Sequence, residues 1–371
     1  MKKNIMEREG ITLFEVFSTI FRIWKRETLG RLFTNRRIIG NMLRASRRRK
    51  RMLKNKGLLV PTAIAVSPTE RCNLRCTGCY SRSHPREGEL TEDVFSSLLS
   101  EAVQLGVGMF VITGGEPFIR DDMTSCFRQN PDALFLVITN GTRFTEALVD
   151  ELSACGNVIP VISIEGNEDH TDRRRGKGVY QAVIHAMELC RQRKLIFGFS
   201  TVCTNTNIDY IGSSEFIDTV VNAGCTLGFY NELIPIVQND MQFLPMKEQK
   251  NRFQKQLSIH RKAKPIVLIN LPEDEYDAEG RCMAVGRGAM HINAQGWVEP
   301  CPFAHYAREN VNTSSFREIL ESPFLRALRE HPTVLQHGKI GCSLVSNREV
   351  FEVIAEQTGA RKTSAAEGIT C

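Results

Sequence analysis

From about residue 60, short apolar runs alternate with longer amphipathic segments, and this alternation limits the folds open to the chain. The short runs have the length of buried strands, whereas the longer segments repeat with helical periodicity. Strands that alternate with helices predict a parallel sheet with right-handed crossovers, and six units are too few for the eight-stranded barrel. The expected strands are Ala63–Ser67, Met109–Thr113, Leu134–Thr139, Val158–Ile164, Ile196–Cys203 and Leu227–Glu232, and the expected helices are Asp93–Leu105, Phe144–Ala154, Gly178–Arg193 and Ser213–Ala223.

Three cysteines follow the first expected strand, because Cys72, Cys76 and Cys79 lie within eight residues. Three thiolates can hold a four-iron cluster and leave one iron without a protein ligand, so that a cofactor or substrate can bind there. Zinc usually takes four ligands and favours Cys-x2-Cys pairs, and only the second gap fits. The spacing therefore favours an iron–sulfur cluster, with a zinc site or thiols that merely share a loop as the alternatives.

Small and polar residues follow the next three strands, at the edge of a parallel α/β sheet where active groups gather. They are Gly114, Gly115, Glu116 and Pro117 after the second strand, Thr139 and Asn140 after the third, and Ser163 and Glu165 after the fourth. Two glycines let the backbone approach a ligand closely, and free backbone groups with a nearby carboxylate can hold an amino group. Taken singly, each motif also reads as an ordinary turn.

In this order the motifs resemble those of the radical S-adenosylmethionine (radical SAM) superfamily. The cysteine loop departs from it at Gly78, where many members carry an aromatic residue, and Tyr80 follows Cys79 instead. The resemblance implies an open six-stranded (β/α) barrel, with Gly114–Pro117 holding the methionine amino group of the cofactor. It further implies that Thr139 and Asn140 border the cofactor, that Ser163 and Glu165 lie near the ribose hydroxyls, and that Arg175 pairs with the methionine carboxylate.

The activity implied by the resemblance is reductive cleavage of S-adenosylmethionine at the 4Fe–4S cluster. The resulting 5′-deoxyadenosyl radical would abstract hydrogen from a substrate, and a one-electron donor such as ferredoxin or flavodoxin would supply the electron. We expect a lipid or tetrapyrrole acid as substrate, and a modified peptide is the second candidate. The rival of another class is a non-catalytic iron–sulfur redox sensor or nucleic-acid-binding protein, which would not need the glycine-rich and polar strand ends.

A second group of cysteines lies near the C-terminus. Cys282, Gly296 and Cys301 resemble the opening of the SPASM/twitch auxiliary-cluster extensions, and a hairpin is expected between the two thiols. The dense set of cysteines that completes a full SPASM domain is missing, and only Cys342 and Cys371 follow. We expect one auxiliary cluster on Cys282, Cys301, Cys342 and an unidentified fourth ligand. The alternative is a vestigial extension with structural cysteines.

The N-terminal part of the chain is strongly basic. Residues 22–56 contain fourteen Lys or Arg and one acidic residue, whereas the whole chain carries a net charge of only +6. Before and within this basic run, apolar residues recur at helical spacing, namely Leu13, Phe14, Phe17, Ile20, Phe21 and Trp24. Such a segment suits an anionic membrane surface, although it can also pack on the main domain or bind nucleic acid. No run is long enough to span a bilayer.

Together these features predict an α/β protein: a partial (β/α)6 TIM-type barrel with a small Cys-containing C-terminal extension and a basic helical N-terminal segment. The expected divisions are 1–59 for the basic segment, 60–270 for the barrel, 271–357 for the extension and 358–371 for a disordered tail. The N-terminus shows no secretory signal, so we expect reduced thiols and a cytoplasmic protein, peripheral at the inner face of the membrane if residues 1–59 bind it.

Overall fold

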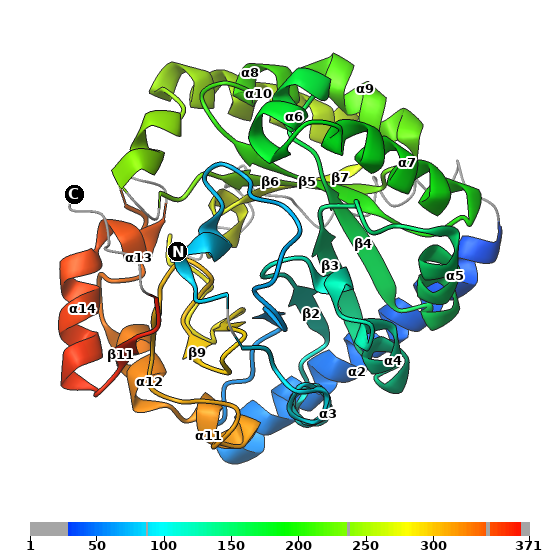
Figure 1. Ribbon diagram of the computed structural model, residues 1–371. Coiled ribbons are helices and arrows are strands. Elements are labelled where there is room, and N and C mark those ends of the chain that lie inside the picture. The colour runs from blue at the N-terminus through cyan, green and yellow to red at the C-terminus, as the bar shows by residue number, and fades with distance from the viewer. Residues whose placement is uncertain (1–28, 87, 236–237, 339–341, 365–371) are drawn as a thin grey trace, which may run out of the picture.

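The computed structural model describes residues 29–86, 88–235, 238–338 and 342–364, and its centre is a curled, largely parallel sheet (Figure 1). Seven parallel strands stand side by side in chain order, from β1 at one end to β7 at the other. Their bounds are β1 Ala63–Val66, β2 Met109–Ile112, β3 Leu134–Thr139, β4 Val158–Ser163, β5 Gly198–Cys203, β6 Leu227–Glu232 and β7 Val267–Leu271. The strands are nearly continuous apolar runs, as expected where helices cover one face and other chain segments the other.

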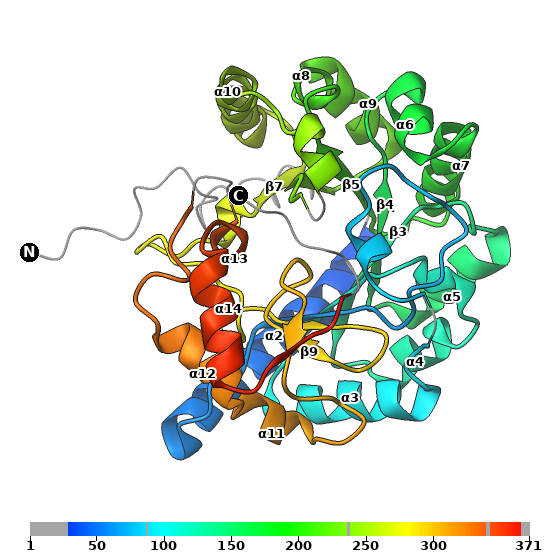
Figure 2. The same cartoon turned by 60° about the vertical axis from the view of Figure 1, so that its left-hand side comes forward.

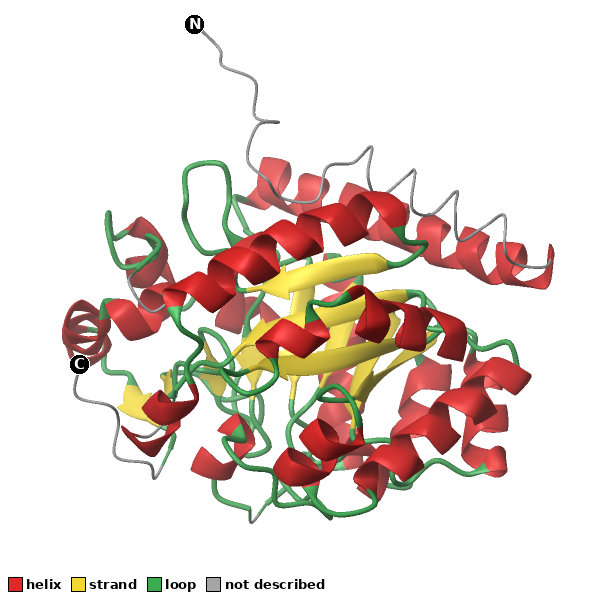
Figure 3. Cartoon of the chain, turned by 90° about the horizontal axis from the view of Figure 1, so that it is seen from above, coloured by secondary structure: helices red, strands yellow, loops and turns green. Residues whose placement is uncertain are grey.

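Helices follow the strands and form the outer layer of the half-barrel (Figures 1 and 3). They are α3 Glu92–Leu105, α4 Met123–Gln129, α5 Glu146–Cys155, α6 Glu168–Arg175, α7 Val179–Gln192, α8 Ile208–Ile211, α9 Ser214–Ala223 and α10 Lys247–Ala263. Helix α3 shows how the sequence defines such an element. The Thr91 side chain caps its first turn, Gly106 ends it in the left-handed conformation, and its apolar face, which includes Phe95 and Leu99, is buried.

The six expected strands and four expected helices are confirmed, with boundaries within about two residues. The structure adds β7, which pairs with β6 in parallel and extends the barrel sheet beyond six strands. It also adds α6, whose eight residues are so rich in charge that no apolar face marks it in the sequence. None of the described helices is long and apolar enough to cross a membrane.

The basic segment contains one long helix, α2 (Leu29–Lys56), which runs along the outside of the barrel (Figure 2). It packs against the C-terminal end of α3: Ala45 is buried, the Arg48 guanidinium donates to the Val103 carbonyl, and the Arg49 guanidinium donates to the Gly106 carbonyl. The packed-helix alternative therefore holds for this part of the segment. The apolar residues from Leu13 to Trp24 lie outside the described residues.

The C-terminal extension continues the main sheet on the β1 side. Strand β8 (His291–Ile292) pairs with β1 in parallel and with β9 (Val298–Glu299) in an antiparallel hairpin, as the sequence predicted. The extension then forms β10 Tyr306–Ala307, α11 Phe316–Leu320, α12 Pro323–Glu330, α13 Ser343–Ser346, α14 Arg348–Gln357 and β11 Arg361–Lys362.

The prediction of a disordered tail is wrong for residues 358–364. Strand β11 pairs with β10, the Arg361 guanidinium lies 3.8 Å from the Trp297 ring centroid, and the Thr363 hydroxyl donates to Glu299. These contacts reach residues that are remote in sequence, and a small, polar composition cannot reveal them. Cys371 lies outside the described residues.

Candidate functional site

The cysteine loop crosses the mouth of the barrel and is held by the turn that follows β2. The Gly115 amide donates to the Thr69 carbonyl (2.9 Å), and the Glu116 amide donates to the Arg71 carbonyl (2.8 Å). The Gly114 amide donates to the Tyr80 hydroxyl (3.3 Å), beyond the last cysteine. Backbone contacts therefore fix the loop on both sides of its three thiols.

These contacts explain why two glycines are needed. A Cβ on Gly115 would lie 2.0 Å from the Arg71 carbonyl oxygen, and one on Gly114 would lie 2.5 Å from that of Thr69. Gly114 also has a φ of +94°, which favours glycine. The backbone amides of this turn therefore bind the cysteine loop, and the chain itself makes one close approach to the glycines. That the backbone of Gly114–Pro117 also holds the methionine amino group of the cofactor stays a prediction.

Glu116 is fully buried and connects the turns after β2 and β3. Its carboxylate accepts from the Thr139 hydroxyl (2.7 Å), the Asn140 amide (2.7 Å) and the Phe118 amide (3.2 Å). Burial raises the pKa of Glu116, although these hydrogen bonds oppose the rise. With three internal donors, Glu116 orders the two turns, and its expected place beside the amino group of the cofactor stays a prediction.

Asn140 in turn reaches the cysteine loop. Its side-chain amide donates to the Asn73 side chain (2.9 Å) and lies 3.9 Å from the Cys72 sulfur. The third-strand turn therefore borders the thiols, and its expected contact with the cofactor stays a prediction. Ser163 is also buried at the carboxyl end of β4.

The thiols of Cys72, Cys76 and Cys79 lie close enough to influence one another electrostatically. Burial raises the pKa of Cys72 and of Cys79, and the guanidinium of Arg174 opposes the rise at Cys79. Three thiols from one loop fit a 4Fe–4S cluster in which one iron is left for another ligand.

The structure also explains why a glycine, Gly78, stands in the cysteine loop where many members of the superfamily carry an aromatic residue. Its φ is +64°, in the left-handed region that disfavours an aromatic residue. The chain turns sharply there, and the Arg174 guanidinium lies 3.4 Å from the Gly78 carbonyl oxygen. The departure from the common cysteine motif therefore accompanies a contact between the loop and α6.

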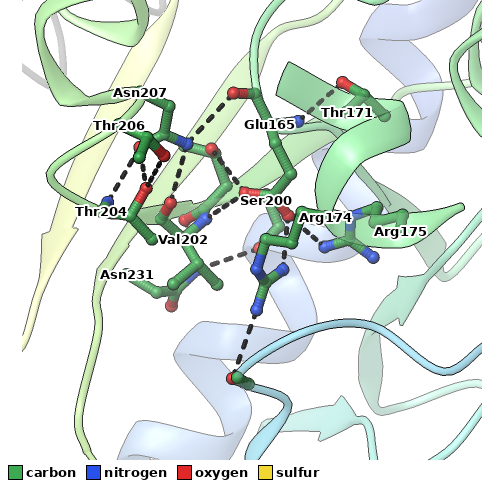
Figure 4. A network of polar contacts seen from close by, with 12 residues as sticks. Glu165, Thr171, Arg174, Arg175, Ser200, Val202, Thr204, Thr206, Asn207 and Asn231 are labelled. Atoms are coloured by element: carbon green, nitrogen blue, oxygen red, sulfur yellow. Dashed lines mark hydrogen bonds and ion pairs between the residues drawn. The ribbon is translucent and has the colours of Figure 1, made fainter. Parts of the chain in front are cut away.

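Glu165 is the centre of a polar network beside the cysteine loop (Figure 4). Its Oε1 accepts from Arg174 (2.6 Å) and Arg175 (2.8 Å), and its Oε2 accepts from the Val202 amide (3.0 Å). Burial raises the pKa of Glu165, but the two arginines outweigh it and hold the pKa below its usual value. Burial lowers the pKa of Arg175. The negative charge of Glu165 and of the Cys76 and Cys79 thiolates has the opposite and larger effect, so the pKa of Arg175 is raised overall.

Arg175 and Glu165 pair with each other, and their expected contacts with the methionine carboxylate and the ribose of the cofactor stay predictions. Arg174 is half-buried and contacts the cysteine loop, whereas Arg173 is exposed and pairs with Asp169. The helical spacing of α6 does not distinguish these arginines, because all three end the same short charged helix.

The turn after β5 is also tied to Glu165. The Asn207 side-chain amide donates to the Glu165 carbonyl (3.1 Å) and the Val202 carbonyl (3.0 Å), as Figure 4 shows. At the end of β6, Glu232 forms an ion pair with Lys250 (2.7 Å) from α10. Polar ends of neighbouring strands therefore converge at one edge of the sheet.

Cys282, Cys301 and Cys342 form a second group of cysteines. Cys282 and Cys342 are buried and Cys301 is half-buried. Burial raises the pKa of Cys301, and the thiols of Cys342 and Cys282 raise it further, so the three lie near one another. The carboxylate of Glu275 influences all three thiols. The hairpin and the segment before α13 thus bring together the cysteines that the sequence singled out.

A curled parallel sheet with three thiols after its first strand defines a class of protein, and sequence comparison identifies it. The model described as the radical SAM superfamily matches residues 66–214, and the SPASM model, described as an iron–sulfur cluster-binding domain, matches residues 282–342. The chain belongs to the radical SAM superfamily and carries a SPASM-type extension. This membership implies a 4Fe–4S cluster, S-adenosylmethionine and auxiliary iron–sulfur binding.

Relatives within the superfamily differ in what they make. The chain is 27% identical to an AdoMet-dependent heme synthase of Methanosarcina barkeri over 76% of its own length and 88% of that protein. It is 23% identical to the sporulation killing factor maturation protein SkfB of Bacillus subtilis, over 68% of this chain and 64% of the other. The structure of Streptococcus suis SuiB bound to S-adenosylmethionine has the same fold, with a TM-score of 0.65, 15% identity, and coverage of 78% and 72%.

Proposed function

We propose that this chain is a radical SAM enzyme that acts on a tetrapyrrole acid. The assignment as a radical SAM enzyme rests on one observation: three thiols converge with the Glu116 and Glu165 networks at one edge of the sheet. The tetrapyrrole rests on the similarity to the heme synthase, which spans most of both chains. The donor of the electron is a small redox protein such as ferredoxin or flavodoxin.

In this proposal Cys72, Cys76 and Cys79 would hold the cluster and leave one of its irons open for S-adenosylmethionine. When both are bound and an external donor supplies one electron, the cluster and S-adenosylmethionine would supply methionine and the 5′-deoxyadenosyl radical that abstracts hydrogen. The protein contributes order and charge: the Gly114–Gly115 turn fixes the loop, and Asn140 lies against Cys72. Arg174 and Arg175 place positive charge beside the cluster thiolates, which favours their ionised form.

Cys282, Cys301 and Cys342 hold the auxiliary cluster in the same proposal. The fourth ligand of this cluster is not among the cysteines that the structure brings together, and its identity stays open.

The test uses full-length protein reconstituted with iron and sulfide without oxygen. With dithionite and S-adenosylmethionine, we expect 5′-deoxyadenosine to form. We also expect an iron porphyrin with propionate side chains to accelerate its formation and to lose carbon dioxide. The Cys76→Ala variant should form none. A fully loaded cluster without 5′-deoxyadenosine would favour the non-catalytic redox protein, whereas 5′-deoxyadenosine without any change in the porphyrin would reject only the substrate.

A peptide is the second candidate substrate, because SkfB is a maturation protein. Many peptide-modifying relatives carry a leader-binding domain of mixed strands and helix at one terminus. The described residues before β1 form one long helix instead. Acceleration of 5′-deoxyadenosine formation by a precursor peptide, and not by the porphyrin, would favour this second function.

We also propose that α2 lies against an anionic membrane surface, where a lipid-like or tetrapyrrole acid would be found. Ile39, Leu43 and Leu53 are each more than half exposed, and helical spacing places them within one stripe that also contains Arg47 and Lys50. Apolar and cationic groups on one exposed face match anionic lipid headgroups. In flotation with anionic vesicles at low salt, the parent should bind and Leu43→Glu should bind less. Equal binding by both would contradict this role of α2.

A further inference from the structure

Two histidines and a carboxylate meet in the interior, and neither of the proposed cluster sites uses them. His84 follows the cysteine loop, Glu299 lies on β9, and His305 lies just before β10. The His84 Nε2 and the His305 Nδ1 are each 3.9 Å from an oxygen of Glu299. One ligand atom from each residue lies within 4.8 Å of those of the other two, and no other described set of three does so.

The three side chains are shielded from water. Their residues are 3% exposed at His84, 0% at Glu299 and 9% at His305. Both ring nitrogens of His84 are buried and have no hydrogen-bond partner. Because a buried imidazole without any partner loses its hydrogen bonds to water, its position needs another explanation. A bound cation would provide one.

Supporting residues hold the carboxylate in place. The His291 Nδ1 donates to the Glu299 Oε2 (2.7 Å), and the Ser67 hydroxyl donates to the His291 Nε2 (2.8 Å), which fixes the tautomer. The Asn293 side-chain amide donates to the Glu299 Oε1 (3.0 Å), and Thr363 also binds this oxygen. Metal-binding carboxylates and imidazoles typically have such an outer shell of hydrogen bonds.

From this geometry we propose that His84, Glu299 and His305 bind a divalent transition-metal ion such as Zn²⁺ or Fe²⁺. Two imidazoles and one carboxylate form a donor set that both ions accept, at about 2.0–2.2 Å for zinc. The observed separations need only small side-chain movements to reach that geometry. The ion would tie the cysteine loop to the hairpin and to the turn before β10, which are remote in sequence.

The charges around the group agree with this proposal. A metal ion binds the neutral form of an imidazole, and the deep burial of His84 favours that form. Burial raises the pKa of Glu299, but His291 and His305 outweigh it and hold the pKa below its usual value.

The experiment titrates Co²⁺ into full-length, cluster-loaded protein that has been treated with a chelator, without oxygen. Cobalt absorbs in the visible range and substitutes for both zinc and iron(II), and metal analysis gives its stoichiometry. We expect about one Co²⁺ per chain, and binding at least about tenfold weaker in His84→Gln and His305→Gln. His185→Gln is the matched control, because His185 is exposed on α7. Cys76→Ser should lose cluster iron and still bind Co²⁺.

Three results would overturn the proposal: no Co²⁺ bound by the parent, equal binding by His84→Gln, or loss of Co²⁺ in Cys76→Ser. If the histidine variants do not fold, pulsed electron paramagnetic resonance of Co²⁺ in the parent decides instead. Couplings to histidine nitrogen are expected there. Their absence would equally overturn the proposal.

Discussion

Replacing Gly115 by alanine tests how the turn after β2 positions the cysteine loop. The new Cβ would lie 2.0 Å from the Arg71 carbonyl oxygen, and ordinary contacts begin at 3.4 Å, so the two chain segments must separate by about 1.4 Å. Such a movement breaks the bonds from the Gly115 and Glu116 amides to the loop. Overpacking costs about 1–3 kcal/mol and each of the two lost hydrogen bonds costs about 0.5–1.5 kcal/mol, which together destabilise by roughly 2–6 kcal/mol.

Two assays follow from this calculation. Urea unfolding of the cluster-free chain should show the loss of stability, and iron analysis after reconstitution should show a lower cluster content. Gly40→Ala is the control, because Gly40 lies within α2 and a Cβ there meets nothing closer than 3.6 Å. This control should be as stable as the parent or more stable by about 1 kcal/mol, because alanine favours helix.

An unchanged iron content in a folded Gly115→Ala protein would refute the reasoning. It would mean that the cysteine loop does not depend on its contact with the glycines. A loss of iron in Gly40→Ala would refute it differently, by showing that cluster assembly responds to any added methyl group.

Three further predictions concern the networks and the tail. Glu165→Gln leaves two largely buried arginine side chains without their carboxylate and should lower the free energy of unfolding in urea by about 3–5 kcal/mol. Asp169→Asn breaks the exposed pair with Arg173 and should change this free energy by no more than about 1 kcal/mol. Similar losses in the two variants would contradict the network. Backbone hydrogen bonds from Tyr180 and Gly178 lower the pKa of Asp172, so its contribution is present above about pH 4 and lost as the pH falls through its folded-state pKa. The stability gap between the parent and Asp172→Asn should therefore stay constant from pH 6 to about 4 and narrow as the pH falls further, and a gap that widens below about pH 4 would show the wrong sign. Arg361→Ala removes the cation above Trp297 and should shift the indole emission to longer wavelength, whereas an unchanged spectrum would mean that the tail does not cover this ring.

The parallel sheet was predictable because its buried strands are short apolar runs, and buried strands dominate the pattern in this class of fold. The strand ends of the site were predictable for the same reason, since Thr139, Asn140 and Glu165 lie at or just after the ends of such runs. Strand β7 was not identified, and it comes after the strongly charged helix α10.

Individual roles within the site were less predictable, because they depend on contacts between segments far apart in the sequence. Glu116 is a case: its three donors come from its own turn and from the end of β3. Arg174 and Arg173 are neighbours on one short helix, and only the packing of α6 against the cysteine loop separates a half-buried residue from an exposed one. The group of His84, Glu299 and His305 left no signal, since its members are scattered and no spacing relates them.

The central claim is that three cysteines leave one iron of the cluster open for S-adenosylmethionine. Electron paramagnetic resonance of the reduced cluster tests it most directly, in Cys282→Ala/Cys301→Ala/Cys342→Ala protein so that only the loop cluster contributes. We predict that S-adenosylmethionine shifts the spectrum, and that Cys76→Ala in the same background shows no cluster signal. A reduced cluster whose spectrum is unchanged by saturating S-adenosylmethionine would contradict the claim.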